Sequence, residues 1–162
     1  MDCLLLIVRH GPAEPAGSEG DAARRLTREG RERMRRAAAA LVELAPKPDQ
    51  IWSSPLVRAR ETAALLAEAF GVAEATPTPF LAHGFDRGEL VVELERAGSG
   101  PYVVVGHEPD VSALTAWLLG AGARSRIKFG SGTSALVSFT SPGAGILHAL
   151  YPLEAFAPPG SG

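Results

Sequence analysis

Cysteine is almost absent from this chain. Its 162 residues include only Cys3, which excludes an internal disulfide and a zinc site built from cysteines. Long apolar runs are also missing, since no stretch approaches the roughly 20 apolar residues of a membrane span. The first residues lack the basic start and longer apolar core of a signal peptide. We therefore expect a cytoplasmic protein with no membrane partner.

An excess of charge of one sign is missing too. The formal net charge is -2, which argues against a general nucleic-acid binder or a protein of the membrane surface. The hydrophobic content of 46% and charged content of 21% are ordinary for a soluble globular protein. We expect a single domain over residues 1–156. Residues 157–162, rich in proline, glycine and serine, are predicted to be a disordered tail.

Strand-like and helix-like segments alternate along the chain. The predicted helices run from Arg28, capped by Thr27, to Leu44; from Ser54-Pro55 through Ala69; from Arg87 to Ala97; and from Asp110 through Leu119. The predicted strands are Cys3 to Arg9, Ile51-Trp52, Val72 to Thr76, Tyr102 to Val105, a short one at Arg126 to Phe129, Ala135 to Phe139, and Ile146 to Tyr151. This order predicts a three-layer α/β/α sandwich with a mostly parallel central sheet. The two closing strands are expected to pair antiparallel.

Polar residues follow three of the predicted strands. These junctions carry Arg9-His10-Gly11, the segment from Ser53 to Thr62, and Val105-Gly106-His107-Glu108-Pro109. The carboxyl ends of parallel strands open on one edge of a sheet, which is where ligands bind. We therefore expect two arginines and two histidines to meet at one point.

These residue types suit chemistry on phosphate. The planar, permanently charged fork of Arg58 matches phosphate oxygens, and the first turn of its helix also favours anions. A neutral His10 can attack phosphorus and hold the group covalently. His107 can donate to an equatorial oxygen, and Gly11 lets backbone approach the ligand. Taken singly, each residue could instead be an ordinary strand-end, helix or loop side chain.

Together the three motifs resemble the histidine phosphatase superfamily, which has the phosphoglycerate-mutase-like fold. Its Arg-His-Gly matches Arg9-His10-Gly11, its Ser-Pro-x-x-Arg-Ala-x-x-Thr matches Ser54 through Thr62, and its Gly-His matches Gly106-His107. The resemblance implies that His10 is a nucleophile that forms a transient phosphohistidine. It implies that Arg9, Arg58 and His107 complete the phosphate pocket, and that no metal or other cofactor is needed.

One residue of the family pattern is replaced. Many members use a glutamate or aspartate as proton donor two positions after a leucine, and here Leu81 is followed at that position by His83. An alkoxide needs protonation to leave, whereas the nitrogen of a phosphohistidine leaves easily. The short chain and the missing acidic residue at this position resemble the bacterial phosphohistidine phosphatase branch. The predicted substrate is therefore a phosphorylated protein carrying phosphohistidine.

Two other functions remain open. A small phosphoester as substrate would require a proton donor, and His83, Asp86 and Glu19 are the candidates. A non-catalytic domain that binds phosphate or a phosphoprotein is also possible on this fold. It would not need the nucleophile His10.

Several residues are secondary candidates near the predicted edge. His83 is expected to contact substrate or to be a rim histidine, and it could act as a general acid. Glu108 is expected to offer its backbone amide to the phosphate. Lys128 could reach the rim, and the arginines between Arg24 and Arg36 are expected to be a solvated helix face or a docking surface. Further acidic candidates near this edge are Glu14, Glu19, Asp21 and Glu108.

Overall fold

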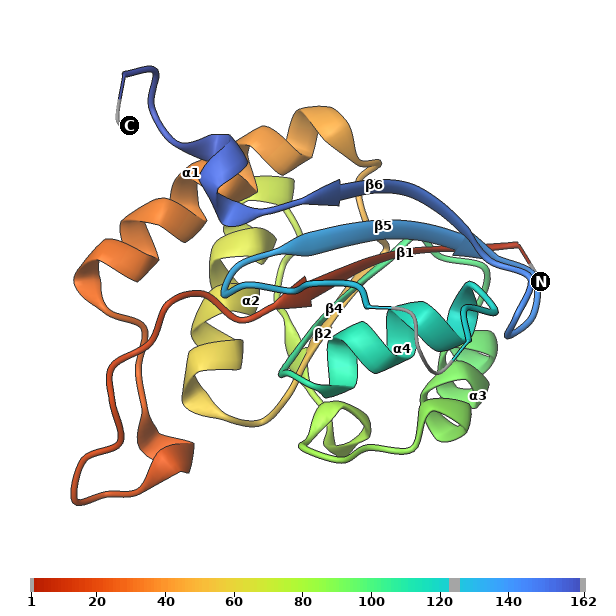
Figure 1. Cartoon of the computed structure of the whole chain (residues 1–162), viewed down its shortest axis with the longest axis horizontal. Helices are drawn as coiled ribbons and strands as arrows, with labels where there is room; N and C mark the ends of the chain where they lie inside the picture. Colours follow the sequence, from red (N-terminus) through yellow and green to blue (C-terminus); the bar gives the residue numbers. More distant parts are fainter. Residues whose placement is uncertain (1, 123–125, 161–162) are drawn as a thin grey trace.

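A six-stranded mixed sheet forms the centre of the protein (Figure 1). The computed structural model describes residues 2–122 and 126–160. The strands are β1 (Cys3–Arg9), β2 (Gln50–Ser53), β3 (Thr76–Pro77), β4 (Tyr102–Gly106), β5 (Ser134–Phe139) and β6 (Ile146–Tyr151), in the order β3-β2-β4-β1-β5-β6. The first four strands are parallel, and β5 is antiparallel to both β1 and β6. The mostly parallel sheet and the antiparallel closing strands are thus confirmed.

Helices cover both faces of the sheet, which confirms the predicted three layers. Figure 1 shows α1 (Arg28–Leu44) and α2 (Val57–Phe70) on one face, with α3 (Arg87–Ala97) and α4 (Asp110–Leu118) on the other. Side chains of β1 alternate between two cores because successive residues of a strand face opposite sides. Leu6 and Val8 pack with α1 and α2, while Leu5 and Ile7 pack with α3 and α4.

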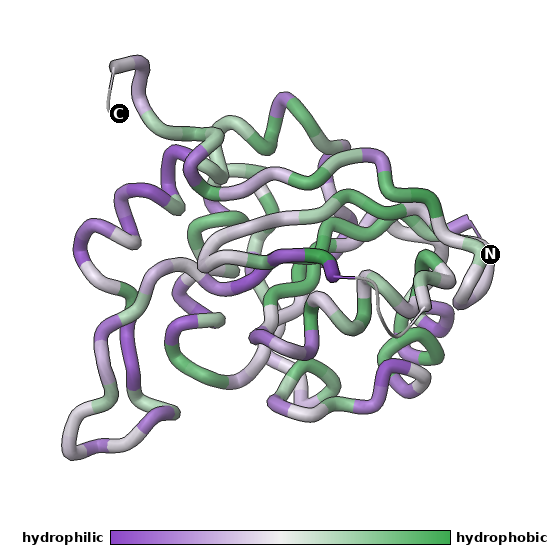
Figure 2. The backbone as a smooth tube through the Cα atoms, in the orientation of Figure 1, coloured by the Kyte–Doolittle hydropathy of each residue, from purple (hydrophilic) through white to green (hydrophobic). Residues whose placement is uncertain are grey.

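The hydropathy of the chain follows these layers. Figure 2 shows apolar residues along the central strands and polar ones along much of α1. Thr27 caps α1 by accepting a hydrogen bond from Gly30 N at 2.8 Å, and Met34, Ala38 and Leu41 form its buried stripe. Most arginines of α1 lie on the opposite, solvated face, as predicted. No helix of the described residues combines the length and the apolar character that a membrane crossing requires.

Three predicted elements differ in the structure. The second helix begins at Val57 rather than at Ser54-Pro55, because the Ser54 hydroxyl bonds Leu56 N (3.3 Å) and His107 instead of capping a helix. The edge strand β3 lies at Thr76–Pro77, at the end of the predicted one. Residues 126–129 are described and form no strand there; the Phe129 carbonyl accepts from the Arg9 side chain.

The end of the chain follows a short 3-10 helix, η3 (Leu153–Phe156). Of the predicted disordered tail, residues 161–162 lie outside the described part of the structure. The single domain over 1–156 and the disorder of the tail stay predictions.

A long segment, residues 12–27, joins β1 to α1 and projects beside the sheet edge (Figure 1). Its two ends are tied together by an antiparallel bridge between Ala13 and Leu26 and by the bond from Glu14 N to Arg25 O, 2.8 Å long. The Glu61 carboxylate on α2 accepts from Leu26 N at 2.8 Å. Between these ties lies the first 3-10 helix of the chain, η1 (Asp21–Ala23). The segment is therefore anchored at its base and carries η1 toward α2.

Candidate active site

The carboxyl ends of β1, β2 and β4 meet at one edge of the sheet. Arg9 pairs with Gly106 in the β1–β4 register, and Ser53 pairs with Val105 in the β2–β4 register. The bond from His10 N to Gly106 O (3.0 Å) extends this pairing past the end of β1. The three polar junctions therefore lie side by side, as the sequence predicts.

His10 is held with one ring nitrogen free to react. Its Nδ1 lies 2.7 Å from Gly11 O, which can only accept, so Nδ1 carries the proton. Its Nε2 then has a bare lone pair, which accepts from Arg58 Nε at 3.3 Å. Burial, together with the charges of Arg58 and Arg9, lowers the pKa of His10 to about 4. The imidazole is thus neutral at physiological pH.

Gly11 is tightly packed beside His10. Its amide donates to Thr62 Oγ1 (3.0 Å), so it is not free for a phosphate. A Cβ at this position would come within 2.4 Å of Met34 Cγ. Gly11 is therefore needed for close packing of the loop against α1 and α2, and its contact with substrate stays a prediction.

Arg58 is the centre of the site. It stands in the first turn of α2, and the residue is only 2% exposed. Its Nη1 donates to Asp21 O at 2.9 Å, and its Nη2 donates to Asp21 Oδ2 at 3.0 Å. Nη2 also lies 3.4 Å from His83 Nε2. One guanidinium thus connects His10, the 12–27 segment and His83.

Arg9 reaches the same edge from β1. Its Nη1 donates to Phe129 O at 2.8 Å, while its buried Nε has no hydrogen-bond partner among the described residues. A buried donor without a partner costs free energy. Arg9 therefore has a donor to spare for an anion at this edge.

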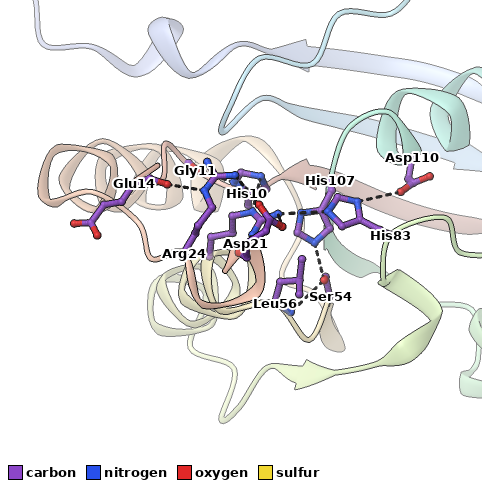
Figure 3. Close-up of polar contacts among 11 residues, drawn as sticks. His10, Gly11, Glu14, Asp21, Arg24, Ser54, Leu56, His83, His107 and Asp110 are labelled. Atoms are coloured by element: carbon purple, nitrogen blue, oxygen red, sulfur yellow. Dashed lines mark hydrogen bonds and ion pairs between the residues drawn. The ribbon is translucent and has the colours of Figure 1, made fainter. Parts of the chain in front are cut away.

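His107 completes the group of histidines. Its Nε2 lies 2.6 Å from Ser54 Oγ, whereas its buried Nδ1 has no partner in the described part of the chain. The His107 ring centroid is 5.2 Å from that of His10 and 4.2 Å from that of His83 (Figure 3). Burial, followed by the nearby His10, His83 and Arg58, lowers the pKa of His107 to about 3. His107 is neutral and has one nitrogen available.

The secondary candidates divide into two groups. His83 lies at the site, with its Nδ1 3.8 Å from Asp110 Oδ2 (Figure 3). The Glu108 carboxylate instead accepts from Ser112 N and Oγ and caps α4, which leaves only the predicted backbone amide for a ligand. Asp86 caps α3 by accepting from Gly88 N and Glu89 N. Lys128 is exposed and lines a separate cavity beside Trp117 on α4.

Sequence reasoning missed three contacts of the site. It named Asp21 only as one acidic residue among several and did not place it on Arg58. It assigned Ser54 to a helix cap rather than to His107, and it gave Asp110 no role beyond opening α4. The serine and threonine of the Ser54–Thr62 motif could have indicated such contacts. The Ser54 hydroxyl bonds His107, and the Thr62 hydroxyl bonds Gly11.

Comparisons with known proteins agree with this geometry. The family model described as histidine phosphatase superfamily (branch 1) matches residues 5–83. An uncharacterized protein of Picosynechococcus is 38% identical over 115 residues, which cover 66% of this chain and 67% of the relative.

Solved structures share the fold over nearly the whole chain. The protein histidine phosphatase SixA complexed with tungstate has a TM-score of 0.81 and 24% identity, over 93% of this chain and 97% of that one. A putative phosphohistidine phosphatase SixA from Nakamurella multipartitia has a TM-score of 0.72 and 26% identity, over 93% and 96%. A mycobacterial glucosyl-3-phosphoglycerate phosphatase has a TM-score of 0.69 and 21% identity, over 92% and 98%.

Proposed function

This chain belongs to the histidine phosphatase superfamily, and from that premise we propose that it removes phosphate from its substrate through a covalent intermediate on His10. In the first step His10 Nε2 forms a bond to phosphorus as the bond to the leaving group breaks. In the second step water attacks the phosphohistidine, and the electron pair of the P–N bond returns to Nε2. Phosphate leaves and the enzyme is regenerated.

The remaining residues bind the phosphoryl oxygens. Arg58 and Arg9 supply permanent positive charge where negative charge gathers on the oxygens, and the free Nδ1 of His107 can add a hydrogen bond. These donors are buried and already oriented, so they need little reorganisation during the reaction. They serve the transition state of both steps.

The observation that carries this proposal is the state of His10. Its Nδ1 is bound to Gly11 O at 2.7 Å, and its bare Nε2 faces Arg58 Nε at 3.3 Å. A domain that only binds phosphate would gain more from a protonated imidazole, which adds charge and a donor. A neutral imidazole with its lone pair beside a phosphate-binding arginine is the arrangement that attack on phosphorus requires.

We propose protein phosphohistidine as the substrate, with the partner being the phosphorylated protein. The position that holds a carboxylate in many family members holds His83. A phosphohistidine nitrogen needs less protonation than an alkoxide in order to leave. The rim of the site is accessible, since the side chains of His83 and Asp21 are 49% and 54% exposed. An open rim suits a phosphate on a protein side chain. The fold neighbours named for phosphohistidine support the same choice.

A small phosphoester is the second candidate. One observation favours it, because His83 Nε2 lies 3.4 Å from Arg58 Nη2 and so places a titratable group at the site. The similar glucosyl-3-phosphoglycerate phosphatase supports such a substrate within this fold.

The absence of a cofactor requirement and the cytoplasmic location stay predictions.

Phosphate release from a phosphohistidine-bearing protein, compared with a panel of phosphoesters, tests the proposal. We expect faster release from phosphohistidine, together with an acid-labile phosphoenzyme that rapid quenching captures. His10→Ala should lose both. His148→Ala, a β6 residue bonded to Ser138, is the matched control and should keep them. Preference for phosphoesters by orders of magnitude would overturn the substrate, and unchanged activity in His10→Ala would overturn the mechanism.

A further inference from the structure

His83 and Asp110 form a histidine–carboxylate pair at the edge of the site (Figure 3). We propose that His83 Nε2 gives a proton to the leaving group and later takes one from the attacking water, with Asp110 as the positioning residue. This inference rests on the proposed function, because it assigns the proton transfers of that reaction. It extends the chemistry of the site from phosphohistidine to phosphoesters whose leaving oxygen needs a proton.

The position of His83 relative to Arg58 is the first observation. The Nε–H and one Nη2–H of an arginine point along the same edge of the guanidinium, and this edge can bind two oxygens of a phosphate. His10 Nε2 lies 3.3 Å from Arg58 Nε, and His83 Nε2 lies 3.4 Å from Nη2. The two imidazole nitrogens therefore stand at the two ends of one phosphate-binding edge. A phosphoryl group bound there has the nucleophile at one end and His83 at the other.

The orientation of the His83 ring is the second observation. The ring lies against His107, with centroids 4.2 Å apart and an angle of 33° between the planes. Its Nδ1 faces Asp110 Oδ2 at 3.8 Å, so Nε2 is the nitrogen directed toward Arg58. The same carboxylate oxygen accepts from Gly84 N at 2.9 Å, which fixes the backbone next to the histidine. Asp110 thus holds the turn and faces the nitrogen remote from the substrate.

Three of the acidic residues considered for this edge are otherwise engaged. Asp21 is closest to Arg58, but hydrogen bonds from Arg24 and Arg58 hold the pKa of its carboxyl below the usual value, so it has no proton to give. Glu108 caps α4 and Asp86 caps α3. His83 is half-exposed and in contact with Arg58, and an imidazole can both donate and accept a proton.

The proton transfers balance over one turnover. In the first step the leaving atom takes the electron pair of its bond to phosphorus and the Nε2 proton of a protonated His83, while the His10–phosphorus bond forms. His83 is then neutral. In the second step water attacks phosphorus, gives one proton to His83 Nε2, and the P–N electron pair returns to His10. The products are the protonated leaving group and phosphate, and His83 is protonated again.

The rate depends on this proton more strongly when the leaving group is more basic, and a series of esters with different leaving groups therefore tests the proposal. Formation of the phosphoenzyme is followed in single-turnover rapid quench with 2,4-dinitrophenyl phosphate, phenyl phosphate and an alkyl phosphate. We expect His83→Gln to slow the alkyl phosphate by about 10²–10⁴-fold, as loss of general acid catalysis does. The dinitrophenyl ester, whose leaving group needs no proton, should react within a few-fold of wild type. Asp110→Asn should show the same selectivity with a smaller loss.

Two results would contradict the assignment. An equal loss across the three esters would mean that His83 only supports the site or binds phosphate. No loss with any ester would mean that another group moves the proton. His148→Gln is the matched control and should behave as wild type throughout. Failure of the proposed function itself is separate, because wild-type enzyme would then form no phosphoenzyme with even the dinitrophenyl ester.

Discussion

The Asp21 carboxylate lies 3.0 Å from Arg58 Nη2, and the Asp21 carbonyl accepts from Nη1 of the same side chain at 2.9 Å. A residue of η1 therefore occupies one end of the guanidinium that is proposed to bind phosphate. Arg24 shares the carboxylate, with its Nη1 3.0 Å from Oδ1. A carboxylate at this place offsets part of the positive charge and repels a phosphate dianion.

Replacing Asp21 with asparagine is expected to strengthen phosphate binding. The amide keeps a similar shape but removes the negative charge, so Arg58 attracts an anion more strongly. Because the Asp21 side chain is 54% exposed, we expect only about a two- to fivefold lower inhibition constant for inorganic phosphate. Inhibition by phosphate at fixed low ionic strength measures this. Asp49→Asn, at the residue just before β2, is the control, and weaker inhibition in Asp21→Asn would contradict the repulsion.

Thr62→Val is expected to destabilise the fold and slow the enzyme together. The Thr62 hydroxyl accepts from Gly11 N at 3.0 Å and donates to Arg58 O at 2.8 Å. Valine has the same shape but leaves the buried Gly11 amide unpaired, which lowers the free energy of unfolding by about 1–3 kcal/mol. Urea denaturation measures the loss.

Thr62→Ser keeps the hydroxyl and serves as the control for this change. It should recover most of the activity, because Gly11 O would again be placed to hold the His10 ring. Equal stability of the valine variant and wild type would show that the amide finds another partner.

The two buried histidines make stability depend on pH. Burial lowers the pKa of His10 to about 4 and that of His107 to about 3, whereas an unfolded histidine titrates near about 6.5. Below about pH 6.5 the unfolded chain binds protons that the folded chain does not, so the free energy of unfolding falls on acidification. Each histidine contributes up to about 1.4 kcal/mol per pH unit between its two pKa values, and nothing above about pH 6.5.

Urea denaturation between about pH 5 and pH 7 measures this slope. His10→Asn should reduce it, whereas His148→Asn, on the exposed strand β6, should reduce it less. An unchanged slope in His10→Asn would show that the imidazole is not held neutral by burial.

Local signals in the sequence were enough to predict much of the fold. Thr27 places the start of α1, because a capping side chain bonds an amide only three residues away. The apolar runs of β1 and β4 predict buried strands. Parallel pairing of these strands places His10 and His107 at one edge of the sheet, so their proximity can be predicted without knowing any side-chain contact.

The contacts that the sequence did not reveal join distant segments. Asp21 and Arg58 are 37 positions apart, and no periodic pattern in the segment between them indicates that they meet. Ser54-Pro55 has the form of a helix start, but the hydroxyl is used by His107 from another strand. Residues 126–129 are of types that suit a strand, but they form none. The Phe129 carbonyl instead accepts a hydrogen bond from the Arg9 side chain.

The tied base of the 12–27 segment has a consequence for how this protein can diverge. Because the Ala13–Leu26 bridge and the Glu61–Leu26 bond close the segment off, its tip can change in length or composition while β1 and α1 keep their places. Lengthening a closed loop costs little, since each doubling of length costs only about 0.6 kcal/mol. Apart from Asp21, which contacts Arg58, the tip of the segment can therefore vary without moving the sheet edge at which His10 and His107 lie.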